Sequence, residues 1–340
     1  MNPGTANRTK RERGRRRAFS LLELMLAVAL MSVIILALYG MFHHTQRALR
    51  SSITQVDVLE AGRATMDMLT RELAQMSPCD LACGTNFVAR VSPVYGVSRV
   101  DLLRTVYGVS GVIKPVVQVL PGTNGPPTQW PFRTNLLEDA LFLSRFNKDF
   151  SVTLYRVLYA DNGVGTLSRF TTNIPANYLS ADKLTTNIIT VLSQPPTNLA
   201  RIADGVIHFR VLPYDADGLP MTATNRYMTN VLSFATRTNL PGTVLYTNIF
   251  PGRNFFLWQD PWVPKDTLRW ATNCAFLGNL APAYVEIELG VLEQQTLEQL
   301  RTLAGSALAT DFLVKHVGQV HLFRQRVPIR ESPPIRADYQ

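Results

Sequence analysis

The feature that most constrains this chain is an apolar run near its start that contains a single acid. No charged residue occurs in Leu24–Phe42, which follows directly on Glu23 and an arginine-rich segment. A helix from Phe19 to Phe42 would be roughly 36 Å long, enough to cross a hydrocarbon core of about 30 Å. An ionised side chain inside such a helix costs at least ~2.5–3.5 kcal/mol on insertion scales. We therefore predict a transmembrane helix over residues 19–42, in which Glu23 requires a functional explanation.

The residues around Glu23 resemble a known processing signal. The segment AFSLLELMLAV, residues 18–28, is similar to the cleavage and methylation signal of type IV prepilins and type II secretion pseudopilins. The resemblance implies that prepilin peptidase removes a basic leader, residues 1–18, by cutting between Ala18 and Phe19. It also implies N-methylation of Phe19 and an assembly role for Glu23, the fifth mature residue. The residue before the cut is Ala18 instead of the usual Gly, so we expect slower processing.

Two other types of N-terminal segment were weighed against a prepilin signal. A secretory signal peptide has a shorter apolar region and a cleavage site of A-x-A type after it, whereas this run is longer and ends at Tyr-Gly-Met-Phe-His-His. An ordinary signal anchor needs neither Glu23 nor the FSLLELM sequence. The anchor remains the alternative to the prepilin signal.

The charge distribution argues for membrane orientation and against nucleic-acid binding. The chain carries a formal charge of +9, with 34 Lys and Arg against 25 Asp and Glu. Seven of those bases and one of those acids lie in residues 1–18, so the leader carries +6 and the remainder only +3. A basic N-terminal flank keeps that end in the cytoplasm. We expect a single-pass protein of the bacterial inner membrane, with everything after Phe42 on the periplasmic side.

The helix is expected to continue out of the membrane as an amphipathic segment, residues 43–78. Apolar residues recur there at the three- to four-residue spacing of one buried stripe, with charged residues between them. Ser77-Pro78 ends the pattern. The stripe consists of Leu49, Ile53, Val56, Leu59, Met66, Leu69, Leu73 and Met76.

The remaining chain predicts a β-rich extracytoplasmic head, residues 79–330, followed by a tail, residues 331–340. A helix followed by many strands is typical of an α+β fold, here a pilin-like one with a mainly antiparallel sheet. Asp161–Gly165 reads as a hairpin turn with Gly163 at positive φ. Thr296–Leu308 has helical character. The expected strands are Phe87–Val91, Val100–Tyr107, Val112–Leu120, Asp139–Arg145, Val152–Tyr159, Thr166–Thr171, Asn187–Leu192, Gly205–Leu212, Val244–Phe250, Tyr284–Leu289 and Val317–Arg326.

Parts of the head resemble the minor pseudopilin J class of type II secretion systems. The similar segments are LFLSRFN, LYRVLYADNGVGTLSRF, Leu199–Gly218, Pro282–Leu289 and His321–Arg330. Residues 92–135 and 214–280 do not fit that pattern and are interpreted as insertions. The resemblance implies a structural role at or near the tip of a pseudopilus. Its implied partners are the I and K pseudopilins, other pseudopilins and the inner-membrane assembly platform.

Two alternative functions remain open. The shared N-terminus is equally typical of a minor pilin of the W type in a type IV pilus. The unplaced segments leave room for a membrane-anchored extracytoplasmic binding protein or enzyme, although the sequence contains no GxSxG, HExxH, P-loop or GxGxxG motif in a strand–helix context.

Few residues in the head suggest metal or redox chemistry. In an oxidising compartment Cys79 could form a disulfide with Cys83, and Cys274 would then have no cysteine to pair with. Asp215 and Asp217 in the sequence Asp-Ala-Asp-Gly are weak candidates for binding calcium, because no bidentate acid follows at the expected distance. A turn is the simpler interpretation, and no cofactor is expected.

Overall fold

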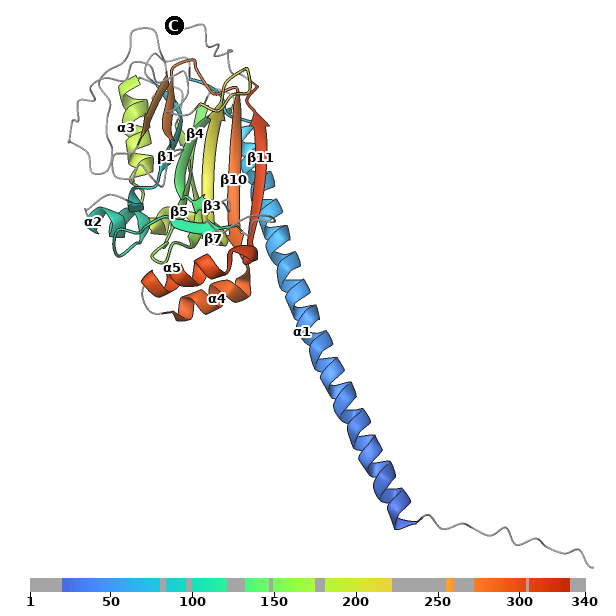
Figure 1. Ribbon diagram of the computed structural model, residues 1–340. Helices are drawn as coiled ribbons and strands as arrows, with labels where there is room; N and C mark the ends of the chain where they lie inside the picture. The colour runs from blue at the N-terminus through green and yellow to red at the C-terminus, as the bar shows by residue number, and fades with distance from the viewer. Residues whose placement is uncertain are drawn as a thin grey trace, which may run out of the picture. The chain divides into compact units, whose positions relative to one another are not determined.

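The computed structural model describes residues 20–79, 84–95, 100–120, 132–146, 149–174, 181–221, 255–259, 272–303 and 306–330 (Figure 1). By its internal contacts the chain divides into two compact units, residues 1–53 and residues 54–340. We describe each unit separately. The strand predicted at Val244–Phe250 lies outside the described residues.

The first unit contains the N-terminal part of one long helix, α1, Leu21–Leu73. The large apolar side chains between Leu21 and Phe42 are exposed in the isolated chain. The helix is long and apolar enough to cross a membrane by length and composition. The helix predicted over residues 19–42 and continued over residues 43–78 is found as α1, which begins at Leu21 and ends at Leu73 within the described residues.

In the second unit the C-terminal part of α1 packs on the head. Met66, Leu69 and Leu73 are buried in the main core, at the predicted spacing. Gly62 allows close approach, because a Cβ there would lie 2.2 Å from the Phe323 ring. The carboxylate of Glu72 accepts a hydrogen bond from Tyr155 at 2.6 Å and pairs with Arg169 at 2.8 Å.

The predicted apolar stripe is only partly buried. Leu49, Ile53 and Val56 are each about half exposed, whereas burial begins at Val58. Within the described residues, the earlier part of the stripe is not covered by protein. It is an apolar surface left open along α1.

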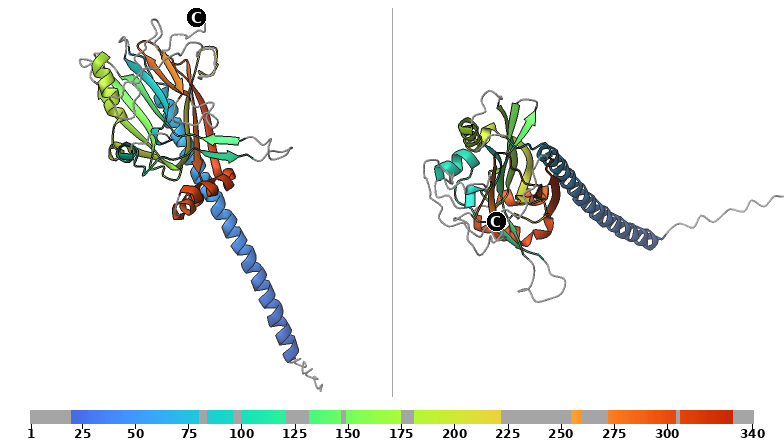
Figure 2. Two further views of the ribbon diagram at one scale, coloured as in Figure 1. Left: turned by 60° about the vertical axis from the view of Figure 1, so that its left-hand side comes forward. Right: turned by 90° about the horizontal axis from the view of Figure 1, so that it is seen from above.

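The second unit is built on an antiparallel sheet. Its described strands follow the order β11-β10-β7-β6-β5-β4-β1-β9-β8, and β2 and β3 form a separate hairpin visible beside it in Figure 2. The predicted α+β fold is thus confirmed. The strands are β1 Thr85–Val91, β2 Val116–Val119, β3 Phe132–Asn135, β4 Glu138–Phe146, β5 Asp149–Leu158, β6 Gly165–Ile174, β7 Ala200–Tyr214, β8 Phe255–Gln259, β9 Thr272–Leu277, β10 Tyr284–Leu292 and β11 Val320–Pro328.

Helices cover the sheet in layers. The C-terminal part of α1 packs on one face, and α3, Ala181–Leu192, contributes Ile188 and Val191 to a second apolar cluster with β4 and β5. Helices α4, Gln294–Thr302, and α5, Ser306–Lys315, form a third cluster with Val116 and Ile207. Short helical turns are η1 Pro93–Tyr95, α2 Val100–Leu102, η2 Leu103–Tyr107, η5 Pro196–Asn198 and η7 Val317–Gln319.

Two strand predictions are wrong. Val100–Tyr107 forms α2 and a π-turn that ends at Gly108, whose φ is +66°. Asn187–Leu192 belongs to α3. In both segments the buried residues recur every three or four positions, as in a helix, and this spacing outweighs the β-branched composition.

Most other strand predictions are confirmed, with small shifts. The strand expected at Val112–Leu120 is limited to β2, and the one expected at Val317–Arg326 begins at Val320 after a 3₁₀ turn. Gly163 has the predicted positive φ of +79°. The helical stretch expected at Thr296–Leu308 is found as α4 and the start of α5. Strands β3, β8 and β9 were not predicted.

Packing of α1 on the sheet predicts different effects for one substitution at two places on this helix. Leu69→Ala should destabilise the head by about 2–5 kcal/mol, because Leu69 is almost fully buried. Leu49→Ala, the matched control, removes an exposed side chain and should change stability by less than about 0.5 kcal/mol. Denaturant unfolding of the detergent-solubilised chain measures both, and equal losses would contradict this packing.

Candidate functional site

The first candidate site is the start of α1, where Ser20 and Glu23 cap the helix reciprocally. The backbone N–H of Glu23 donates to Ser20 Oγ at 3.2 Å, and the backbone N–H of Ser20 donates to Glu23 Oε2 at 3.1 Å. The Ser20 hydroxyl lies 3.4 Å from the same carboxylate oxygen. This arrangement is a capping box, which satisfies two backbone donors that a helix otherwise leaves open.

The capping box gives Glu23 polar partners within its own chain. Ser-x-x-Glu before an apolar run is its sequence signature, so Ser20 could have been identified from residues 20–23. Ala18 and Phe19 lie outside the described residues, and the proposed cleavage and methylation there stay predictions. The assembly role of Glu23 likewise stays a prediction.

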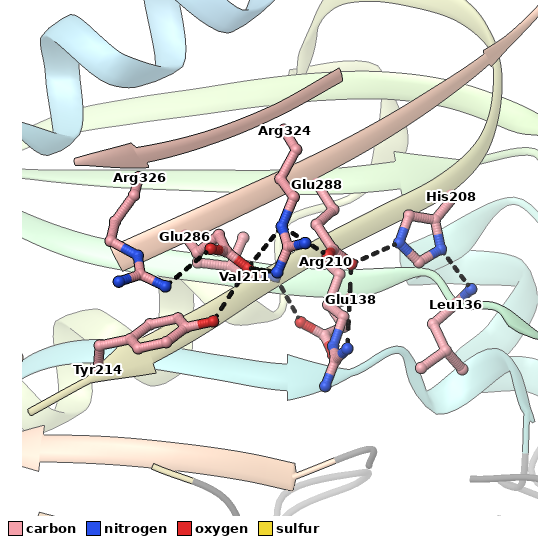
Figure 3. A network of polar contacts seen from close by, with 10 residues as sticks. All are labelled: Leu136, Glu138, His208, Arg210, Val211, Tyr214, Glu286, Glu288, Arg324 and Arg326. Atoms are coloured by element: carbon pink, nitrogen blue, oxygen red, sulfur yellow. Dashed lines mark hydrogen bonds and ion pairs between the residues drawn. The ribbon is translucent and has the colours of Figure 1, made fainter. Parts of the chain in front are cut away.

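The second candidate is a polar network in the head, which we call the sheet seam (Figure 3). It forms where β7 leaves its pairing with β6 and meets the segment before β4. There the backbone N–H of Phe209 donates to Leu136 O at 2.8 Å, and Leu137 forms a parallel bridge with Phe209. The seam consists of Leu136, Glu138, His208, Arg210, Val211, Tyr214, Glu286, Glu288, Arg324 and Arg326.

His208 supplies one side-chain link in the seam. The backbone N–H of Leu136 donates to His208 Nδ1 at 3.0 Å, so this nitrogen carries no proton. His208 Nε2 therefore holds the proton and donates to Glu288 Oε2 at 3.3 Å. Burial lowers the pKa of His208 despite the nearby carboxylate, and the hydrogen bond from His208 lowers the pKa of Glu288. The neutral imidazole is thus the form that the seam accommodates.

Glu138 supplies the other side-chain link. Its Oε2 accepts a hydrogen bond from the backbone N–H of Val211 at 2.7 Å, and its Oε1 lies 3.9 Å from Arg210 Nε. Burial raises the pKa of Glu138 to about 7, although Arg210 and the Val211 N–H oppose the shift. Two titratable side chains therefore occupy positions where a continuous sheet would have backbone partners.

The rest of the seam is a charge ladder across β7, β10 and β11. Arg324 Nε donates to Glu286 Oε1 at 2.8 Å and lies 3.3 Å from Glu288 Oε1. Arg326 binds Glu286 Oε2 at 3.2 Å and stacks on Tyr214, with 3.8 Å from guanidinium carbon to ring centroid. The two glutamates of β10 are therefore matched by arginines on the neighbouring strands, and such opposite-charge pairs across strands stabilise a sheet.

The pKa of Glu138 predicts how stability depends on pH. Between pH 4.5 and about 7 the unfolded chain loses the Glu138 proton before the folded chain does, so this group lowers stability as pH rises. Glu138→Gln keeps an acceptor for Val211 but cannot ionise. As the pH rises from 4.5 to 8, the free energy of unfolding of the variant should increase by roughly 1–3 kcal/mol relative to that of the wild type.

Thermal unfolding at pH 4.5, 6 and 8 tests this prediction. His208 contributes a pH dependence of the opposite sign. Because its pKa is lowered in the folded chain, stability falls as the pH drops below 6.5. Since both proteins retain His208, its contribution cancels in the comparison. A stability difference that does not change with pH would show that Glu138 titrates normally.

A buried ion cluster lies elsewhere in the sheet, across β1, β4 and β5. Asp139 lies 3.0 Å from Arg90 Nη2 and 3.1 Å from Arg156 Nη2, and Tyr107 donates to it at 2.6 Å. Arg156 also donates to Leu192 O at the C-terminus of α3, at 2.8 Å. Burial alone would raise the pKa of Asp139, but Arg156 and Arg90 outweigh it and the pKa falls. The carboxylate thus holds two cations within the fold.

Removing that carboxylate should be costly. Asp139→Asn leaves two guanidinium groups without a compensating charge and should destabilise the head by about 3–5 kcal/mol. The matched control is Asp204→Asn, which breaks the exposed pair with Arg201 and should cost about 1 kcal/mol or less. Denaturant unfolding compares them, and similar losses would show that the buried cluster contributes no more than a surface pair.

Two of the three cysteines lie in the described part of the head, and both are buried. Cys79 is buried, and its backbone N–H donates to Asn86 Oδ1 at 2.8 Å. Cys83 lies outside the described residues, so the disulfide with Cys79 stays a prediction. Cys274 is buried in β9, and burial raises the pKa of its thiol.

Asp215 closes a turn. Its Oδ1 accepts the Leu219 N–H at 2.7 Å, and Gly218 has a φ of +76°. In the part of the chain that the structure describes, no group of three or more His, Cys, Asp or Glu residues could hold a metal ion. Calcium binding by Asp215 and Asp217 stays a prediction.

Comparison with known proteins returns one match. The family model for the prokaryotic N-terminal methylation motif matches residues 13–39. No curated protein and no solved structure matches the chain. The matched segment contains the end of the basic leader, the Ser20–Glu23 capping box and most of the apolar run. Together with the long apolar helix and the antiparallel head, it marks a type IV pilin-like protein, a class of prepilin peptidase substrates.

Proposed function

We propose that this chain is a minor pseudopilin, a structural subunit at or near the tip of a type II secretion pseudopilus. The observation that carries the proposal is the position of Glu23, in the first turn of a helix whose other side chains as far as Phe42 are uncharged. Such a helix is stable in a bilayer or against other apolar helices. The carboxylate of Glu23 favours the contact with other helices over the bilayer whenever a neighbouring helix supplies a cation.

The proposed mechanism is a transfer of the apolar helix from lipid to protein. Prepilin peptidase removes residues 1–18 and methylates Phe19, which leaves a positively charged amino terminus. The subunit resides in the inner membrane until it enters the filament. There Glu23 pairs with the amino terminus of a neighbouring subunit and fixes the axial register, because an unpaired buried charge costs several kcal/mol.

Segments of the head support the J class among the pseudopilins. The segments that resemble that class fall on β4, β5, β6, β7, β10 and β11, which are neighbours in the sheet. The J class would bring the head near the filament tip, beside the I and K pseudopilins. A minor pilin of the W type in a type IV pilus is the second candidate, because the N-terminal motif is common to both. A gene neighbourhood with a secretin would favour secretion, and one with twitching genes would favour a pilus.

Two variants separate the charge of Glu23 from its capping role. Glu23→Gln keeps the capping geometry and removes the charge, so it should insert and be cleaved normally but lose co-purification with partner pseudopilins about tenfold or more. Ser20→Ala keeps the charge and loses the cap, at a cost of about 0.5–2 kcal/mol in helix stability, and should still co-purify.

Co-purification from membranes of cells that express the other pseudopilins measures both variants. Unchanged recovery of partners with Glu23→Gln would refute the pairing. Loss with Ser20→Ala alone would assign the role to helix capping.

A further inference from the structure

A basic surface lies on α1 just beyond the apolar run. No acidic residue occurs between Glu23 and Asp57 in the sequence, so this stretch carries a net positive charge. The side chains concerned are exposed (Figure 1 shows this stretch in blue). They are His43, His44, Arg47 and Arg50.

Three of these side chains share one side of the helix. At about 100° per residue, His43, Arg47 and Arg50 lie within about 60° of one another around the axis. We call these three residues the basic face. The exposed stripe of Leu49, Ile53 and Val56 is centred about 120° around the axis from the basic face. An apolar partner helix that contacts the stripe would therefore lie beside Arg50 and would leave Arg47 exposed.

The distance from the apolar run brings the basic face to the level of lipid headgroups. Arg47 and Arg50 follow Phe42 by five and eight residues, about 7.5 and 12 Å along the helix. The headgroup layer extends roughly 5–8 Å beyond the hydrocarbon core on each side. Helical side chains tilt toward the N-terminus, which here is the membrane end, and a long arginine can reach further back.

We propose that the basic face binds the phosphate groups of anionic phospholipids in the leaflet on the head side of the membrane. The inference rests on the proposed residence of the helix in a bilayer. Guanidinium groups bind phosphate through two parallel hydrogen bonds, and each basic residue near an anionic surface strengthens attraction about fivefold. These contacts hold the helix at one depth, and the subunit must break them when it is extracted into a filament.

Lipid selectivity of the reconstituted full chain tests the proposal. Spin-labelled phosphatidylglycerol or phosphatidylcholine is introduced into the head-side leaflet of phosphatidylcholine vesicles, and electron paramagnetic resonance gives the relative association of each with the protein. Arg47→Gln combined with Arg50→Gln should lower the preference for phosphatidylglycerol about fivefold or more. The matched control is Arg63→Gln with Arg71→Gln, which removes two exposed charges about 32 Å or more beyond Phe42 and should leave the preference unchanged.

The outcomes distinguish this inference from the proposed function. An unchanged preference in the first variant, or an equal loss in the control, overturns the basic face as a lipid site while leaving bilayer residence intact. A chain that does not remain with the vesicles on flotation overturns bilayer residence and the inference together. If the first variant keeps its lipid preference but loses partner pseudopilins, the arginines contact protein, which also overturns the lipid site.

Discussion

The proposed function depends on one physical constraint, which is that a carboxylate in an apolar helix needs a partner. The capping box supplies local hydrogen bonds to Glu23 but no opposite charge. Hydrogen bonds alone do not replace the hydration of an ion, so a cation on another subunit would stabilise the helix further. In the proposed function this difference directs the helix from lipid into a filament. Insertion and assembly can then use the same apolar surface.

The head applies the same rule to buried charges. Asp139 is fully buried, yet it is matched by Arg90 and Arg156 and hydrogen-bonded by Tyr107. In the sheet seam, His208 and Glu138 replace backbone partners where β7 separates from β6. Both positions make the fold of the sheet depend on polar side chains. The packing of α1 on the sheet combines an apolar contact with the polar contacts of Glu72 to Tyr155 and Arg169.

The sequence predicted the elements with strong periodicity and missed those that depend on distant contacts. The helix through Leu73 and the strands around Asp161–Gly165 follow from local pattern and turn chemistry. Val100–Tyr107 was assigned to a strand from its β-branched residues, although its buried side chains have helical spacing. The seam could not be predicted, because Glu138 and Val211 are far apart in sequence and their contact depends on the twist of the whole sheet. The capping role of Ser20 was not predicted, although Ser-x-x-Glu before an apolar run is its sequence signature.

The most direct test of the central claim is the N-terminus of the protein extracted from membranes of cells that contain prepilin peptidase. Mass spectrometry of the N-terminal peptide should show a chain that begins at Phe19, heavier by one methyl group. That result would show that the apolar helix is presented with a free, charged amino terminus five residues from Glu23 inclusive. A chain that still carries residues 1–18 in such cells would contradict the account and favour a simple membrane anchor.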